Sequence, residues 1–318
     1  MRVPAGGANA AAALLPPTRI GPRLFEWGSR TYVMGIVNVT PDSFSGDGLL
    51  ATIAGGAAPG RVTSGRVTPG RATPGRVAVV EAAVVQARRM VEEGADILDV
   101  GGESTRPGHE PVSVAEETAR VVPVIAAIHA ALPEIPISVD TAKAQVAAAA
   151  LEAGADLLND IWGVGRDDAM ARLAAERHVP MIVMHNRDVA RYTDFVAELL
   201  SDLRAALDRA TKAGVPRENL IVDPGFGFGK TPEYNLEALR HLGELRELGQ
   251  PVLLGTSRKS TLGRVLGGVP PEERLEATLA TTALGIASGV DIVRVHDVLA
   301  NVRAARMCDA VVRGGGAR

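Results

Sequence analysis

The chain has 318 residues, of which 46% are hydrophobic and 22% charged, so it can bury a sizeable core beneath an ordinary polar surface. Its 34 Lys and Arg residues against 37 Asp and Glu residues give a net charge of −3, which lacks the basic excess typical of nucleic-acid-binding proteins. The only cysteine, Cys308, excludes an internal disulfide framework and a cysteine-rich zinc site, and it favours a reducing cytoplasmic location.

The amino-terminal segment contains a short Ala and Leu run that ends at Pro16 and Pro17. This run is too short for a convincing secretory signal, and no later stretch reaches the roughly 18 apolar residues of a membrane span. We therefore expect residues 1–19 to form a flexible arm, residues 20–318 to form one folded domain, and the protein to have no membrane partner.

From Thr31 onward, short runs rich in Val and Ile alternate with longer segments of helical periodicity. The predicted strands are 31–39, 96–102, 136–140, 156–161, 180–185, 220–225, 251–257 and 291–297. The predicted helices lie near 78–93, 114–131, 143–153, 167–177, 194–213, 232–247, 275–288 and 298–312. This strict alternation predicts an α/β fold, a (β/α)8 TIM barrel. An open doubly wound sheet is the alternative, but no Gly-rich dinucleotide turn follows the first strand.

One segment interrupts this alternation. The sequence GRVTS-GRVTP-GRATP-GRVA repeats with a period of five residues between Gly60 and Ala78. Its Gly, Pro, Thr and Arg content provides no apolar face, so we expect residues 47–77 to be a disordered, low-complexity insertion in the first βα loop. Without the insertion, the remaining chain is close to the roughly 250 residues of a plain barrel.

Two groups of polar residues end the predicted strands, which is where barrel enzymes carry their chemistry. The first group is Asp140, Asn159 and Asp223, whose carboxylates and amide suit a planar heterocycle with several N–H donors and ring-nitrogen acceptors. The second group suits a polyanion such as a diphosphate, with Mg²⁺ as an added ligand; it contains Arg106, Lys259, Arg294, His296 and the neutral Asn38.

The glycine-rich run DPGFGFGK (223–230) lacks the Walker spacing, which argues against nucleoside triphosphate hydrolysis. Its glycines instead allow close approach of the backbone to a flat ligand, against which Phe226 or Phe228 could pack. His178 and His185 do not have the spacing of a metal site.

An ordered set of motifs resembles the dihydropteroate synthase family along nearly the whole predicted barrel. The motifs are MGIVNVTPDSFS (34–45), DVGGESTRPG (99–108), SVDT (138–141), ND (159–160), MH (184–185), DPGFGFGK (223–230), GTSRKS (255–260) and RVHDV (294–298). The resemblance implies a transferase of folate biosynthesis. It would join 6-hydroxymethyl-7,8-dihydropterin diphosphate to p-aminobenzoate, releasing diphosphate and forming 7,8-dihydropteroate. The family also implies a homodimer and a sulfonamide target.

The resemblance also implies roles for individual residues. The pterin would be held by Asp140, Asn159, Asp223, Lys259, Met184 and Gly227. Diphosphate would be held by Asn38, Thr105, Arg294 and His296, with Mg²⁺ at Asn38. The p-aminobenzoate would lie near Phe44, Phe228 and Ser260. Two loops, around 42–45 and 105–107, would close over the site, and the catalytic group would be Asp223, Lys259, Arg294, Asp42 and Arg106. The first loop departs from the family pattern after Ser45, where Gly46-Asp47-Gly48 leads into the repeat.

Diphosphate is a leaving group whose developing charge a cationic mouth would stabilise, and a dihydropterin can delocalise positive charge at its methylene carbon. Dissociation before attack by the arylamine is therefore reasonable, and no strong general base is required. Two alternatives remain open. One is a pterin-binding methyltransferase on the same barrel, which has no need of a diphosphate clamp. The other is a catalytically silent paralogue that binds pterin or stabilises a partner.

Overall fold

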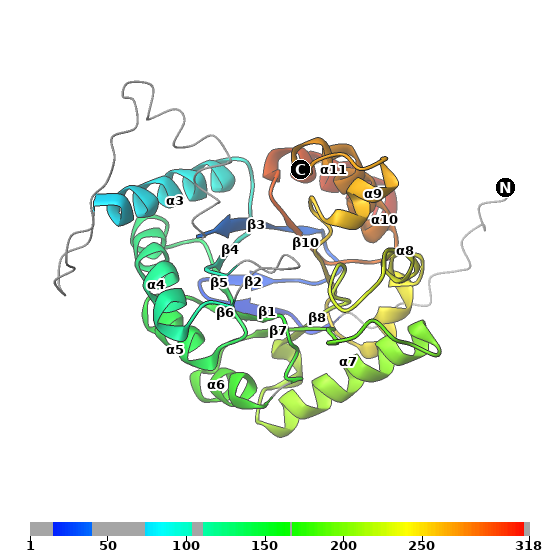
Figure 1. Ribbon diagram of the computed structural model, residues 1–318, viewed down its shortest axis with the longest axis horizontal. Coiled ribbons are helices and arrows are strands. Elements are labelled where there is room, and N and C mark those ends of the chain that lie inside the picture. The colour runs from blue at the N-terminus through cyan, green and yellow to red at the C-terminus, as the bar shows by residue number, and fades with distance from the viewer. Residues whose placement is uncertain (1–14, 40–73, 104–110, 166, 315–318) are drawn as a thin grey trace.

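The computed structural model describes residues 15–39, 74–103, 111–165 and 167–314, and its centre is an eight-stranded parallel barrel (Figure 1). The strands are β3 (Tyr32–Asn38), β4 (Ile97–Gly101), β5 (Ile137–Asp140), β6 (Leu157–Asp160), β7 (Met181–Met184), β8 (Leu220–Asp223), β9 (Leu253–Leu254) and β10 (Ile292–Val295). They pair in the order β8-β7-β6-β5-β4-β3-β10-β9. The ring closes where the Val222 amide donates to the Pro251 carbonyl at 2.9 Å. The predicted TIM barrel is confirmed.

Helices surround the barrel and return the chain to the start of each following strand (Figure 1). They are α3 (Pro74–Glu92), α4 (Val114–Ala131), α5 (Ala144–Glu152), α6 (Ala169–Arg177), α7 (Phe195–Lys212), α8 (Pro232–Arg240), α9 (Ser260–Val265), α10 (Leu275–Ala287) and α11 (Val298–Val312). The 3-10 turns are η1 (Arg217–Asn219), η2 (Leu242–Leu248) and η3 (Pro271–Glu273). Short helix α9 and the 3-10 turns η1 and η3 were not predicted.

Two predicted boundaries differ from the structure. Helix α3 begins at Pro74, four residues before the predicted start at 78, so the end of the repeat belongs to this helix and not to the insertion. Proline is tolerated in the first turn of a helix because the amide it lacks has no partner there. The predicted helix 232–247 divides at His241 into α8 and η2. Residues 1–14 of the predicted arm and 47–73 of the predicted insertion lie outside the described residues.

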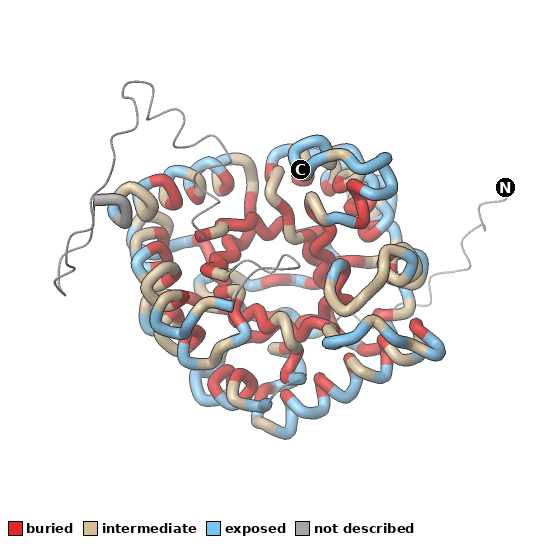
Figure 2. The backbone as a smooth tube through the Cα atoms, in the orientation of Figure 1, coloured by how far each residue is buried: buried red, intermediate tan, exposed pale blue. Residues whose placement is uncertain are grey.

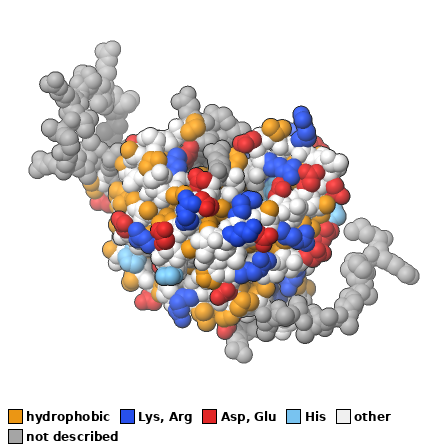
Figure 3. Space-filling view, turned by 90° about the horizontal axis from the view of Figure 1, so that it is seen from below, with side chains coloured by type: hydrophobic (Ala, Val, Ile, Leu, Met, Phe, Trp, Pro, Cys, Tyr) orange, Lys and Arg blue, Asp and Glu red, His pale blue; other side chains and the backbone are white. Residues whose placement is uncertain are grey.

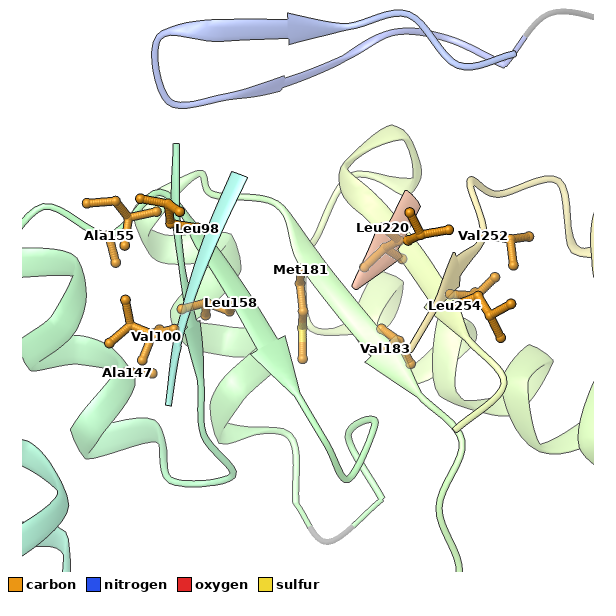
Figure 4. Packing of buried hydrophobic residues seen from close by; sticks show 14 of the residues in the cluster. Leu98, Val100, Ala147, Ala155, Leu158, Met181, Val183, Leu220, Val252 and Leu254 are labelled. Atoms are coloured by element: carbon orange, nitrogen blue, oxygen red, sulfur yellow. The ribbon is translucent and has the colours of Figure 1, made fainter. Parts of the chain in front are cut away.

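A β-hairpin closes the end of the barrel at which the strands begin. Its strands, β1 (Thr18–Ile20) and β2 (Arg23–Phe25), pair antiparallel and cross near those strand ends (Figure 4). The Trp27 indole donates to Thr18 Oγ1 at 2.9 Å, and Thr18 Oγ1 donates to the Glu218 carbonyl at 2.6 Å. The predicted flexible arm therefore extended too far, because Thr18 already belongs to this hairpin.

The barrel strands alternate between two hydrophobic clusters. One set of side chains packs outward against the helices, as Leu98, Val100, Leu158 and Val183 do in Figure 4. The alternate set points into the barrel and packs with Phe25 and Trp27 of the hairpin segment; it contains Met34, Ile97, Leu157, Ile182, Ile221, Leu253 and Ile292. Because strand side chains alternate with a period of two, the residue two positions after each inward apolar residue also faces inward. The hairpin end of the barrel is thus a packed floor.

Burial follows the same layers, with buried strands in the centre and exposed outer helix faces (Figure 2). The face in Figure 3 shows acidic and basic side chains interspersed. Gly94, Gly154 and Gly289 each follow the end of a helix and have φ of 103°, 108° and 93°, the left-handed conformation in which a glycine ends a helix. In the part of the chain that the structure describes, no helix is both long enough and apolar enough to cross a bilayer.

Candidate active site

The candidate site lies directly above the apolar floor, at the carboxyl ends of the strands. On four strands, the residue two positions after the floor residue is polar: Ile97 is followed by Asp99, Leu157 by Asn159, Ile221 by Asp223 and Ile292 by Arg294. Asp140 ends the neighbouring strand β5. The period of the strands therefore aims these five polar side chains into the same end of the barrel.

Arg294 joins the polar side chains of three strands. Its Nε donates to Asp99 Oδ2 and its Nη2 to Asp140 Oδ2, each at 2.6 Å. Asn159 Nδ2 also donates to Asp99, at 3.3 Å to Oδ2. Burial raises the pKa of Asp140, while the Arg294 guanidinium beside it lowers it. We hold Asp140 to be ionised, because a charge-assisted contact of 2.6 Å to a guanidinium strongly favours the carboxylate.

Lys259 lies on the segment that leads into α9, close enough to interact electrostatically with Asp223, Arg294 and Asp140. Its Nζ donates to the Phe226 carbonyl and lies 4.4 Å from the centre of the Phe228 ring, a cation–π contact. Burial lowers the pKa of Lys259 to about 8, and the Asp223 carboxylate opposes that shift. Burial also raises the pKa of Asp223, whose Oδ1 accepts the Gly225 amide at 2.7 Å. Lys259 and Asp223 are therefore poorly solvated, and burial shifts the pKa of each toward its neutral form.

A second part of the site opens beside this pocket. Asn38, at the end of β3, and His296, just after β10, line a cavity of about 460 Å³. The His296 ring Nδ1 lies 2.9 Å from Ser257 Oγ, and Ser257 Oγ accepts the His296 amide at 3.1 Å. Arg89 of α3, Arg258 and Arg303 also line the cavity, together with Glu93 and Asp297. Glu93 pairs with Arg89 at 3.7 Å and Asp297 with Arg258 at 2.8 Å, so the lining carries both signs of charge, and the Asn38 amide and the His296 imidazole are its groups that suit an anion.

The structure thus brings together most of the predicted site residues. Met184 is buried at the end of β7, Phe228 is half-buried beside Lys259, and Ser260 is exposed at the first residue of α9. Gly227 has a φ of 87°, and a Cβ there would lie 2.9 Å from Lys259 Cδ, so glycine lets the lysine pass close to the turn. Four predicted residues lie outside the described part of the chain: Asp42, Phe44, Thr105 and Arg106.

Arg294 was predicted to hold the diphosphate, and Asp140 to hold the pterin. The two side chains are paired with each other at 2.6 Å, so the two predicted groups adjoin at Arg294. Asp99 was not predicted as a site residue, although it is fully buried and paired with Arg294 at 2.6 Å. The signal was available in the sequence, since Asp99 is a charged residue inside the apolar run DILDVGG and two positions after Ile97.

Comparison with known proteins gives the family. Residues 67–296 match the model of the pterin binding enzyme family. The dihydropteroate synthase of Clostridium beijerinckii is 50% identical over 296 residues, covering 93% of this chain and 99% of that protein. The solved dihydropteroate synthase of Clostridium difficile with pteroic acid is 46% identical with a TM-score of 0.79, over 91% of this chain and 99% of that one.

A second solved structure is similar over the same extent. The dihydropteroate synthase of Xanthomonas albilineans with 4-aminobenzoic acid is 40% identical with a TM-score of 0.80, covering 93% of this chain and 98% of that chain. The chain therefore belongs to the dihydropteroate synthase family, and it is a transferase of folate biosynthesis.

Proposed function

We propose that the polar strand-end side chains bind the pterin half of 6-hydroxymethyl-7,8-dihydropterin diphosphate through one cluster: Arg294 with Asp99, Asp140, Asn159 and Asp223. The cavity lined by Asn38 and His296 is proposed to bind the diphosphate half. The observation that carries this proposal is the connected cluster of Asp99, Arg294 and Asp140, with contacts of 2.6 Å, above an apolar floor. A flat heterocycle buries its ring on such a floor and satisfies its polar edge with the side chains above it.

Asp140, Asn159 and Asp223 present oxygen acceptors to the ring's N–H groups, and Lys259 is the donor for an acceptor on the ring. Met184 and Gly227 would contact the ring faces. Since Asp140 and Asp99 are paired with Arg294 before substrate arrives, their orientation is fixed in advance. Preorganised charge of this kind stabilises a transition state without reorganisation during the reaction.

In the reaction that we propose, the bond from the pterin methylene carbon to the diphosphate oxygen breaks, and its electron pair leaves with diphosphate. The amine lone pair of p-aminobenzoate then forms the new carbon–nitrogen bond, and that nitrogen loses a proton. The negative charge of Asp223 favours the cationic methylene, while Arg294 and His296 stabilise the leaving group. The p-aminobenzoate is proposed to lie beside Phe228 and Ser260, with Phe44 on the facing loop.

Thr105 is proposed as a further diphosphate ligand, and Asp42 and Arg106 as catalytic residues on the two loops, on the strength of the family motifs that contain them.

Mg²⁺ is the cofactor that the family resemblance implies. Within the described residues no three His, Cys, Asp or Glu side chains gather as a metal cluster. Mg²⁺ does not need such a cluster, because it binds through only one or two protein oxygens when a substrate supplies phosphate oxygens. The Asn38 amide oxygen at the cavity wall would be that ligand. When bound, the ion would neutralise charge on the leaving diphosphate.

We also propose a homodimer, which the family resemblance implies. Large apolar side chains are exposed on the last two helices of the described chain: Leu284 of α10 and Leu299, Met307, Val311 and Val312 of α11. An exposed apolar face of packed helices is suited to a second copy of the chain.

The cytoplasm remains our proposed location, on the argument from the single cysteine. A solved Yersinia pestis relative is in complex with a sulfonamide drug, and we expect sulfonamides to compete with p-aminobenzoate here.

The test of this function is an initial-rate assay on the purified full chain. The protein is incubated with the pterin diphosphate and p-aminobenzoate, and 7,8-dihydropteroate and diphosphate are quantified with and without Mg²⁺. Equal amounts of both products, formed only when both substrates are present, support the proposal. Binding of the pterin diphosphate without product would support the silent-paralogue alternative. Methyl transfer from a methylated folate to a corrinoid protein would instead support the methyltransferase alternative.

A further inference from the structure

A half-buried lysine that the reaction does not use, Lys230, contacts the glycine-rich turn of the site. Lys230 Nζ donates to the carbonyls of Gly225 and Phe228, each at 3.0 Å, and lies 2.8 Å from His185 Nδ1. The His185 carbonyl is a weaker fourth partner at 3.4 Å. An ammonium group has three donors, so these three near acceptors match its capacity in full.

The histidine holds the lysine in one orientation. Because Nδ1 accepts the hydrogen bond from Lys230, the ring proton is on Nε2. The Nε2–H group then donates a hydrogen bond to Asp202 Oδ2 at 3.1 Å. Burial lowers the pKa of His185 to about 3, which keeps the ring neutral. Arg187 Nε donates to the same Asp202 oxygen at 2.7 Å and fixes the carboxylate. The result is a continuous chain of donors and acceptors from the surface carboxylate to the turn.

The turn itself is in a conformation that needs such support. Gly225, Gly227 and Gly229 have φ of 68°, 87° and 53°, and a Cβ on Gly225 would lie 1.9 Å from the His185 carbonyl oxygen. On its other side, the Gly227 amide donates to Asn235 Oδ1 at 2.7 Å, and Asn235 Nδ2 donates to Thr261 Oγ1 at 3.0 Å. The turn is therefore held at two carbonyls by Lys230 and at one amide by Asn235.

Between these fixed points, Phe226 and Phe228 of the turn contact Lys259. The Phe226 carbonyl accepts from Lys259 Nζ, and the Phe228 ring lies 4.4 Å from the same atom. We propose that Lys230 is a positioning residue for Lys259: by binding the Gly225 and Phe228 carbonyls, it orients the Phe226 carbonyl and the Phe228 ring that hold the Lys259 ammonium at the pterin pocket. This inference rests on the proposed assignment of Lys259 to the pterin.

The test compares two ligands by titration calorimetry on the full-length protein: 6-hydroxymethylpterin, which has no diphosphate, and inorganic diphosphate with Mg²⁺. Lys230→Met keeps the length of the side chain but removes its three donors. We expect this change to weaken pterin binding by at least about tenfold, the effect of losing one or two hydrogen bonds, and diphosphate binding by less than about threefold. Lys212→Met, at the exposed end of α7, is the matched control and should alter neither affinity.

A second pair of variants decides the matter if Lys230→Met does not fold. His185→Gln can still offer an amide oxygen to Lys230, whereas His185→Leu cannot. The proposal predicts that His185→Leu loses pterin affinity and that His185→Gln recovers most of it. Equal losses for pterin and diphosphate in either variant would show a merely structural role and overturn the inference.

The outcome for the wild-type protein separates this inference from the proposed function. If the wild-type protein makes 7,8-dihydropteroate but Lys230→Met binds pterin unchanged, the positioning role is wrong and the function stands. If the wild-type protein binds neither ligand and makes no product, the proposed function fails and the inference fails with it.

Discussion

Asp99 positions the site although it is assigned no direct contact with the substrate. It is completely buried, it pairs with Arg294, and Asn159 donates to it. Removing one member of a buried charged pair leaves the other uncompensated, which typically costs about 3–5 kcal/mol. We therefore expect substitution of Asp99 to lower both the stability and the activity of the protein.

For Asp99→Asn, we expect kcat/KM for the pterin diphosphate to fall by at least about thirtyfold, because the carboxylate that pairs with Arg294 becomes a neutral amide with a single acceptor oxygen. Asp96→Asn is the matched control, since Asp96 is a buried carboxylate paired with Arg30 at 2.6 Å and lies just before β4, at the floor end of the barrel. That variant should lose stability in urea denaturation while the folded fraction keeps its kcat/KM within about threefold. Equal kinetic losses in both variants would contradict a specific role for Asp99.

A second prediction concerns pH. Burial lowers the pKa of Lys259 to about 8, so its ammonium is present below pH 8 and is lost as the pH rises through that value. Burial raises the pKa of Asp223, so its carboxylate is lost as the pH falls through a value above the ordinary aspartate range. The expected kcat/KM profile is a bell with an alkaline limb near pH 8. Stopped assays across pH 5 to 10 measure it, and a profile that stays flat from pH 7 to 10 would contradict the assignment of Lys259.

At the scale of elements, the alternation of strands and helices was predictable from the sequence because each element is long enough to show its period. Helices 114–131 and 298–312 were predicted with the bounds that α4 and α11 have. The hairpin could not be predicted in this way, because three-residue strands such as β1 and β2 are too short to show a period. The break at His241 has only Gly243, two residues further on, as a local signal, and a single glycine does not by itself predict where a helix ends.

The site residues that end predicted strands could also be identified from the sequence, whereas the contacts between distant residues could not. Asp140, Asn159 and Asp223 end recognisable strands, so their convergence follows from the fold alone. The pairing of Arg294 with Asp99 could not be foreseen, because it joins residues 195 positions apart through the closure of the barrel. The role of Lys230 depends on the detailed path of a turn, which no periodicity encodes.

The hairpin is expected to contribute stability and no catalytic group. Trp27→Ala removes a buried indole from the floor and its hydrogen bond to Thr18, and it should cost about 3–5 kcal/mol in the free energy of unfolding. Leu24→Ala, on the adjacent strand with a side chain 50% exposed, is the control and should change that free energy by less than about 0.5 kcal/mol. Urea denaturation gives both values, and an unchanged stability for Trp27→Ala would show that the hairpin does not form the floor.

At the scale of the whole molecule, the proposed dimer leads to a further prediction. Met307 and Val311 lie four residues apart on α11, so their exposed side chains share one face of the helix. Met307→Glu should place a charge in the apolar contact and convert the dimer to a monomer in sedimentation analysis at micromolar concentration. Leu24→Glu, on the hairpin, should leave the dimer intact. A wild-type protein that sediments as a monomer would contradict the proposed interface.

The most direct test of the account is a comparison of turnover in three proteins: the wild type, Asp223→Asn and Lys259→Met, each verified as folded by circular dichroism. If the strand-end side chains carry the reaction, each substitution removes a preorganised electrostatic partner, and the formation of 7,8-dihydropteroate should fall by at least about a hundredfold. Folded variants that turn over both substrates at a rate near that of the wild type would contradict the assignment of this site.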